Sequence, residues 1–222
     1  PAYRHLFSGL LSTIDLRNDP VSCYEALLKF EPPSIDFLLP HGNWDTPPPG
    51  RVPGDPATPY ADWLIEVFEH WYRAPVRKTR IRLFSEIFRL LLGRPSSSEA
   101  VGLSPVAVAV VETNGAIEQV DTLKSAYHGA TGTPLHVARD SFDSALLLPQ
   151  IAARQIGRRA LAAQCRSCPL QRVCGGGHYT HRYRSGTGFA NPSVYCPDLF
   201  RLITHIQGAV AKDMATLIRP SS

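Results

Sequence analysis

The sequence predicts an α/β protein, and three observations support this prediction. Apolar strand candidates at residues 8–16 and 35–39 flank a helix candidate at residues 20–30. A turn signal at residues 114–115 predicts a β-hairpin in the second half of the chain. A long amphipathic pattern covers residues 198–218 and predicts a terminal helix. The strand–helix–strand order favours a parallel sheet, because two parallel strands need a helix-length crossover.

The first helix has a clear start signal. Asp19 precedes Pro20, which predicts Asp19 as the N-cap and Pro20 as the first helical residue. A Pro- and Gly-rich stretch at residues 45–59 predicts a loop that crosses the surface. Thr58 is expected to cap the next helix, which covers residues 61–72.

That second helix carries Trp and Phe at helical spacing, and we interpret its aromatic stripe as core. A strand at residues 77–83 and a helix at residues 84–93 are expected to follow. Strands at residues 106–111 and 116–121 should form the hairpin through a type I′ turn. A helix at residues 151–163 is then expected to lead into a cysteine-rich segment.

Composition limits the class of protein. The 222 residues are 44% hydrophobic and 19% charged, which is typical of a globular chain with a sizeable core. No apolar run approaches the roughly 20 residues needed to cross a bilayer, so we expect no membrane association. The net charge of +4 is only a weak indication of an acidic partner. Clustered cysteines with metal-ligand spacing favour a reducing, cytoplasmic location.

Four of the five cysteines lie in one segment, with the spacing C-x2-C-x5-C-x21-C. They are Cys165, Cys168, Cys174 and Cys196. Four thiolates at this spacing predict a fully ligated metal centre, either zinc or an iron–sulfur cluster. Spacing alone leaves both open, and a set of disulfides is a third, weaker interpretation. Cys23 lies among apolar neighbours on the first helix and is expected to be a core residue.

The stretch CGGGHYTHRYR, followed by GFANPSVYCPDL, resembles the C-terminal end of radical SAM enzymes with a SPASM or twitch domain. More narrowly, it is similar to the FxsB-type group, which modifies ribosomally made peptides. SPASM domains carry C-x2-C-x5-C-x3-C and a later cysteine. His178 stands at the x3-C position here, and the hairpin also lacks the family's cysteines. The resemblance therefore implies one auxiliary [4Fe-4S] cluster held by the four cysteines.

The resemblance also implies an architecture. Residues 1–95 would be late strands of a partial (β/α)6 radical SAM barrel with a Pro-rich loop. Residues 96–222 would be a small α+β twitch/SPASM-like domain with a hairpin and a long C-terminal helix. Ligands gather at the carboxyl ends of parallel strands, and S-adenosylmethionine binds there in the family. The candidate cofactor-binding residues are Thr13, Asp15, Asn18, Leu39 and His41.

The implied activity is that of a peptide maturase. Family members of this type use a 5′-deoxyadenosyl radical to form carbon–carbon, cyclophane-type crosslinks in a precursor peptide. Such an enzyme also needs an electron donor protein. The C-x3-C-x2-C motif that holds the catalytic cluster is absent from the 222 residues. We therefore expect this chain to be the C-terminal part of a longer enzyme and to be inactive alone, with S-adenosylmethionine and a second [4Fe-4S] cluster bound in the whole enzyme.

Two other functions stay open at this stage. A zinc-stabilised module could use its basic loop to bind an acidic protein or, less expectedly, nucleic acid. A degenerate family member could carry or position a peptide without chemistry. The sequence also leaves open whether the cluster relays electrons, staples the fold or positions substrate.

Overall fold

The computed structural model describes residues 3–105 and 108–218, and its internal contacts divide the chain into two compact units. The first unit comprises residues 1–40, 49–96 and 195–222, and the second comprises residues 41–48 and 97–194. The segments on the two sides of residue 194 therefore belong to different units. The predicted functional division after residue 95 stays a prediction.

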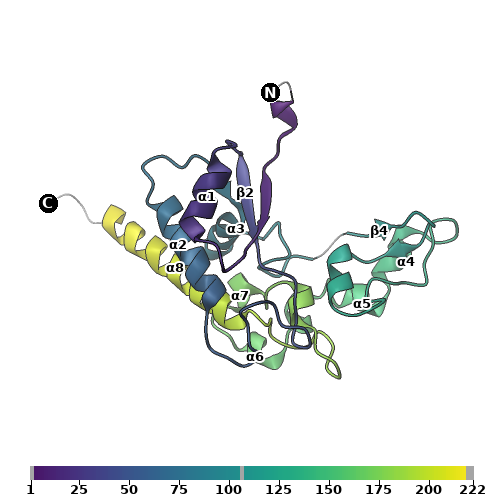
Figure 1. Cartoon of the computed structure of the whole chain (residues 1–222). Coiled ribbons are helices and arrows are strands. Elements are labelled where there is room, and N and C mark those ends of the chain that lie inside the picture. Colours follow the sequence, from purple (N-terminus) through teal and green to yellow (C-terminus); the bar gives the residue numbers. More distant parts are fainter. Residues whose placement is uncertain (1–2, 106–107, 219–222) are drawn as a thin grey trace. The chain divides into compact units, whose positions relative to one another are not determined.

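A small parallel sheet forms the centre of the first unit (Figure 1). Its strands are β1 (Leu10–Thr13), β2 (Ser34–Leu38) and β3 (Arg80–Ile81), in the order β1-β2-β3. Thr13 pairs with Leu38, so the carboxyl ends of β1 and β2 lie side by side. The predicted strand–helix–strand unit is confirmed: β1 is shorter than the predicted strand at residues 8–16, and β2 lies one residue before the predicted strand at residues 35–39.

In its described residues, the first unit also contains four α-helices. They are α1 (Pro20–Leu28), α2 (Pro59–Tyr72), α3 (Arg82–Leu91) and α8 (Cys196–Ile218). A short 3₁₀ helix, Arg4–Leu6, precedes β1. The predicted start of α1 is confirmed, since the Asp19 carboxylate accepts the Ser22 N–H at 2.7 Å. Helices α2 and α8 run alongside each other (Figure 1).

The core of the first unit is aromatic, and α2 supplies much of it. Every member of its predicted stripe is buried, with an exposed fraction of 6% or less: Trp63, Leu64, Val67, Phe68 and Trp71. Phe68 packs edge-on against Phe84 of α3, with ring centroids 5.3 Å apart. The interpretation of this stripe as core is confirmed.

Helix α8 is buried along only its first half. Leu199, Leu202, Ile203 and Ile206 are buried, whereas Met214 is 50% exposed. The apolar pattern along residues 198–218 therefore predicts the helix correctly and overstates how far it is buried.

The second unit is built from short elements. Its hairpin pairs β4 (Val110–Val111) with β5 (Ile117–Glu118). Its helical segments are a 3₁₀ helix at Asp121–Ser125, α4 (Phe142–Leu146), α5 (Pro149–Ala152), a 3₁₀ helix at Gly157–Ala160, α6 (Ala163–Arg166), α7 (Gln171–Cys174) and a 3₁₀ helix at Tyr179–Arg182. Leu123, Ala126 and Ala130 form a small buried cluster in this unit.

Two predictions for this unit were wrong in detail. The hairpin turn is centred on residues 113–114, with the Gly115 N–H bonded to the Glu112 carbonyl. A type I′ turn needs positive φ at both of its central residues. Among the described non-glycine residues only Glu31 has positive φ, so the central residues 113 and 114 do not, and the turn is not of type I′; Gly115, with φ +86°, follows them. The expected helix at residues 151–163 is also interrupted: α5 ends at Ala152, and a 3₁₀ helix begins at Gly157, whose φ is +54°. Residues 106–107 of the expected strand lie outside the described residues.

None of the helices in the described ranges is both long and apolar enough to cross a bilayer.

Candidate functional site

Four of the predicted cofactor-binding residues lie at or just after the carboxyl ends of β1 and β2, which pair in the first unit. Thr13 ends β1, and Asp15 and Asn18 lie in the turn before α1. Leu39 directly follows β2. Ile14 donates its N–H to the Leu38 carbonyl at 3.0 Å, which extends the pairing to this edge. The topology therefore brings these four residues to one edge of the sheet.

The Asp15 carboxylate is held by a local ion pair. Arg17 Nη2 lies 2.6 Å from Asp15 Oδ2, and Arg17 Nε donates to both carboxylate oxygens. These hydrogen bonds lower the pKa of Asp15 to about 2. Asp15 is therefore ionised at neutral pH and can accept further hydrogen bonds at the strand edge.

His41 belongs to the second unit, where it lies beside two other histidines. Its ring centroid is 6.0 Å from those of both His178 and His181, which are 5.1 Å apart. Burial lowers the pKa of His178 to about 3, and the charges of His41, Arg154 and Arg182 act in the same direction. Burial also lowers the pKa of His181. Both residues are therefore neutral imidazoles at neutral pH.

Three of the predicted cluster ligands lie on one compact segment of the second unit. Cys165 is in α6, Cys168 follows it, and Cys174 ends α7. The Cys168 N–H bonds to the Cys165 carbonyl at 3.3 Å. Burial raises the pKa of the Cys165 thiol. The Arg182 charge acts against this increase in pKa, and nearby Cys168 adds to it. Cys196, the fourth predicted ligand, begins α8 in the first unit.

Three consecutive glycines follow Cys174, and each has positive φ: +60°, +81° and +69° for Gly175, Gly176 and Gly177. A Cβ on Gly175 would lie 1.7 Å from the carbonyl oxygen of Gly102. The Gly102 N–H in turn bonds to the Cys174 carbonyl at 3.3 Å. Glycine is therefore required at position 175 by both conformation and space.

A buried arginine lies inside this loop. Arg182 is 8% exposed, and its Nη2 donates to the Gly175 carbonyl at 2.7 Å and the Gly177 carbonyl at 2.6 Å. Burial lowers the pKa of Arg182, and the thiols of Cys174 and Cys165 oppose this effect. Within the described ranges no carboxylate pairs with Arg182. A buried cation needs a compensating anion, and these thiols are the anionic candidates beside it.

A second buried arginine lies nearby with its own partner. Arg154 Nη2 is 2.7 Å from Glu99 Oε2, and both Arg154 and Arg182 lie over the Tyr179 ring. One small pocket of about 50 Å³ is lined in part by Arg182, Arg154, Glu99, Gly175 and Tyr179.

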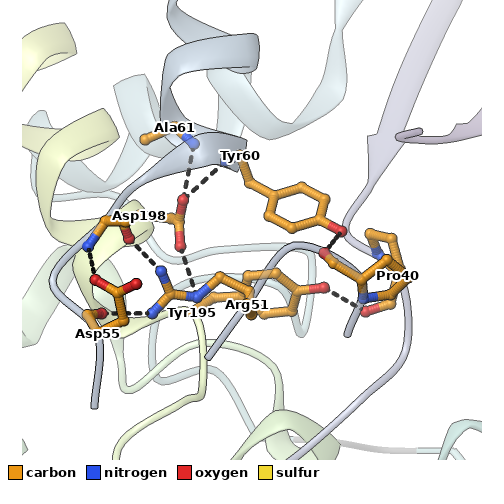
Figure 2. A network of polar contacts seen from close by, with 9 residues as sticks. Pro40, Arg51, Asp55, Tyr60, Ala61, Tyr195 and Asp198 are labelled. Atoms are coloured by element: carbon orange, nitrogen blue, oxygen red, sulfur yellow. Dashed lines mark hydrogen bonds and ion pairs between the residues drawn. The ribbon is translucent and has the colours of Figure 1, made fainter. Parts of the chain in front are cut away.

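In the first unit, a polar network holds the start of α8 two residues after Cys196 (Figure 2). Asp198 Oδ1 accepts the N–H groups of Tyr60 and Ala61, and Asp198 Oδ2 lies 3.5 Å from Arg51 Nε. Arg51 also donates to the carbonyls of Asp55 and Ala57. The Tyr195 hydroxyl donates to the Pro40 carbonyl at 2.7 Å. This network fixes the residues on both sides of Cys196.

Sequence reasoning missed Arg182, Arg51 and Asp198 as functional candidates. In the sequence, Arg182 is only one residue of the stretch that carries the family resemblance, and Arg51 lies in the predicted surface loop. Asp198 appeared only as a residue of the terminal helix. The available signal was the proximity of Arg182 and Asp198 to the cysteines along the chain.

In residues 3–105 and 108–218, His, Cys, Asp and Glu side chains do not gather in groups of three or more that would hold a metal ion. The side chains present still fit the group in chemical type, because thiols are the ligands of iron–sulfur clusters and those of Cys165 and Cys174 act electrostatically on the buried Arg182 guanidinium.

Comparisons with solved structures define the class of fold. The mixed α/β architecture, with its small parallel sheet and long C-terminal helix, is similar to that of solved anSMEcpe structures. The neighbours are structures of anSMEcpe, a radical SAM maturase with a SPASM/twitch domain. No family model and no curated protein sequence matches the chain.

Two of these structures illustrate the likeness. "Native anSMEcpe with bound AdoMet and Cp18Cys peptide" has a TM-score of 0.71 at 16% identity, over 94% of this chain and 58% of that one. "Native anSMEcpe with bound AdoMet" has a TM-score of 0.69 at 16% identity, over 92% of this chain and 56% of that one. The chain thus spans less than two thirds of the length of these neighbours, and at this identity the likeness establishes the fold.

Proposed function

We propose that the chain is the C-terminal part of a radical SAM peptide-modifying enzyme and holds one auxiliary [4Fe-4S] cluster. The ligands are Cys165, Cys168, Cys174 and Cys196. Residues 1–95 supply late strands of the partial barrel, and residues 96–222 form the twitch/SPASM-like domain. When bound, the cluster supplies one-electron redox capacity or a rigid staple.

The observation that carries this proposal is the setting of Arg182. A buried guanidinium that is bonded to the carbonyls of Gly175 and Gly177 lies near the thiols of Cys165 and Cys174. A tetrahedral zinc site with four thiolates would also be anionic, so this observation favours an anionic metal centre. The fold likeness to a radical SAM maturase and the sequence resemblance favour iron and sulfide over zinc.

We also propose that the strand edge binds S-adenosylmethionine through Thr13, Asp15, Asn18 and Leu39, with His41 as a further ligand. The parallel register that aligns β1 with β2 supports this assignment for the first four residues. The ionised Asp15 carboxylate would accept hydrogen bonds from the hydroxyl or ammonium groups of the cofactor. The solved neighbours are described as having AdoMet bound.

The substrate in this proposal is a ribosomally made precursor peptide, in which the enzyme forms carbon–carbon crosslinks of the cyclophane type. Two solved neighbours are described with a bound peptide, which supports a peptide partner. The crosslink rests on the sequence resemblance alone. An electron donor protein and an upstream cluster-binding segment complete the enzyme, so the chain alone is inactive.

Anaerobic purification tests the metal. The chain should be brown and contain about four iron and four sulfide per polypeptide, as a [4Fe-4S] cluster requires. A colourless protein with one zinc would replace the proposal by a zinc-stabilised module. The full encoded polypeptide, given S-adenosylmethionine, a reductant and its precursor peptide, should produce a peptide that is lighter by two hydrogens. A peptide of unchanged mass would contradict the crosslinking function.

A further inference from the structure

We propose that Arg182 is a positioning residue for the auxiliary cluster: its charge raises the reduction potential of the cluster. This inference rests on the proposed function, because it requires that Cys165 and Cys174 hold an iron–sulfur cluster. Two equally buried arginines of the second unit, Arg182 and Arg154, differ in the groups that they contact.

Arg182 and Arg154 are alike in burial and in their position over the Tyr179 ring. Each is 8% exposed, and their guanidinium carbons lie 5.6 and 5.3 Å from the centroid of the Tyr179 ring. Arg154 is neutralised by Glu99, at 2.7 Å. In the described part of the chain, Arg182 bonds only to backbone carbonyls, which carry no net charge.

Its hydrogen bonds hold the Arg182 charge in one place. Nε and Nη2 both donate to the Gly177 carbonyl, at 3.2 and 2.6 Å, and Nη2 also reaches the Gly175 carbonyl. A Cβ on Gly176 would lie 3.1 Å from the Arg182 guanidinium carbon, so the loop closes around this group. The side chain therefore cannot turn toward solvent without breaking the loop that follows Cys174.

The positive charge of Arg182 would act differently on the oxidised and reduced states of the cluster. Four thiolates around a [4Fe-4S]²⁺ core give a net charge of about −2, and one added electron makes this about −3. A fixed positive charge nearby attracts the reduced state more strongly than the oxidised state, and burial strengthens this attraction. The reduction potential of Fe–S clusters depends on net charge and solvent exposure. Removing the Arg182 charge should therefore disfavour reduction.

The test is an anaerobic redox titration of the full chain with dithionite, followed by electron paramagnetic resonance. We expect Arg182→Gln to lower the equilibrium constant for reduction at least tenfold, which is about 59 mV for one electron. The double variant Arg154→Gln/Glu99→Gln is the matched control, because it removes both charges of a neutral pair, and its constant should stay within threefold of the wild type. Arg182→Lys retains the charge and should also stay within threefold.

Equal shifts in Arg182→Gln and in the Arg154→Gln/Glu99→Gln double variant, or no shift in either, would overturn the inference. If Arg182→Gln holds too little cluster to titrate, Arg182→Lys decides, because a tenfold drop in that charged variant would contradict a role for charge. The inference and the proposed function fail differently. Wild-type protein without iron and sulfide overturns the proposed function, whereas a loaded wild type with unresponsive variants overturns only the role of Arg182.

Discussion

Asp198 caps a helix to which it does not belong: from the first turn of α8, its Oδ1 accepts the backbone N–H of Tyr60 at 2.9 Å. The Ala61 N–H bonds to the same oxygen at 3.0 Å, so both donors come from the first turn of α2. Thr58, which the sequence predicts as the cap, makes no side-chain cap bond. The carboxylate also pairs with buried Arg51, as Figure 2 shows.

The first prediction concerns this buried ion pair. Asp198→Ala removes the cap and leaves Arg51 buried without its partner, so we expect the free energy of unfolding to fall by about 3–5 kcal/mol. Asp198→Asn keeps an oxygen for the two N–H groups and should lose less. Urea denaturation, followed by circular dichroism, measures both.

Asp62 is the control for this experiment. It forms a half-exposed ion pair with Arg201 at 2.7 Å, which joins α2 to α8. Exposed pairs contribute little, so Asp62→Ala should cost less than about 1 kcal/mol. A loss as large as that of Asp198→Ala would show that burial of the Arg51–Asp198 pair has no special role.

The second prediction concerns the loop after Cys174. Gly175→Ala places a Cβ 1.7 Å from the Gly102 carbonyl oxygen, in addition to the strain of its positive φ. Gly186 also has positive φ, but its Cβ would have open space. Gly186→Ala should therefore cost only about 1–2 kcal/mol, the strain of a left-handed residue. Gly175→Ala should cost more and reduce the iron content. Equal stability and iron content in both variants would contradict the steric argument.

The sequence predicts local features of this fold well. Asp19 and Pro20 mark the start of α1, and the apolar stripe of α2 marks its buried face, because both signals depend on neighbours along the chain. The interruption between Ala152 and Gly157 was missed, because the apolar pattern continues through it and a single glycine does not reveal its φ.

The long-range contacts could not be predicted in this way. The cap of α2 comes from Asp198, which is 138 residues from Tyr60. Arg51 lies in a Pro- and Gly-rich stretch that is typical of surface loops, yet it is buried because its guanidinium finds the Asp198 carboxylate. The setting of Arg182 likewise depends on how the glycine loop turns back. The four-cysteine ligand set itself stays a prediction.

The third prediction tests this ligand set. Cys168→Ala removes one of four thiolates, so we expect the chain to lose most of its iron after anaerobic reconstitution. Cys23 is a residue of α1, and burial raises the pKa of its thiol, which disfavours the thiolate that a metal needs. Cys23→Ala should therefore leave the iron content unchanged. Equal iron loss from the two variants, measured by colorimetric iron and sulfide assays, would reject the assignment.

The fourth prediction concerns stability in acid. The pKa of buried His178 is lowered to about 3, whereas an unfolded histidine titrates near 6.5. Between these two values the unfolded state binds the additional proton, so stability rises with pH across this window and is lost as pH falls. His178 alone should contribute a slope approaching about 1.4 kcal/mol per pH unit. Burial dominates over the Glu99 carboxylate, which lies 4.0 Å from His178 Nε2 and favours the charged form.

His178→Asn removes this titration and should flatten the dependence of unfolding free energy on pH between the folded and unfolded pKa values. His128→Asn, at an exposed position of the same unit, is the control for the substitution itself. His181, whose pKa burial also lowers, should keep part of the slope in the His178 variant. Urea titrations at several pH values, with equal cluster loading in each protein, measure these slopes. An unchanged slope in His178→Asn would mean that His178 is protonated in the folded protein at the same pH as in the unfolded chain.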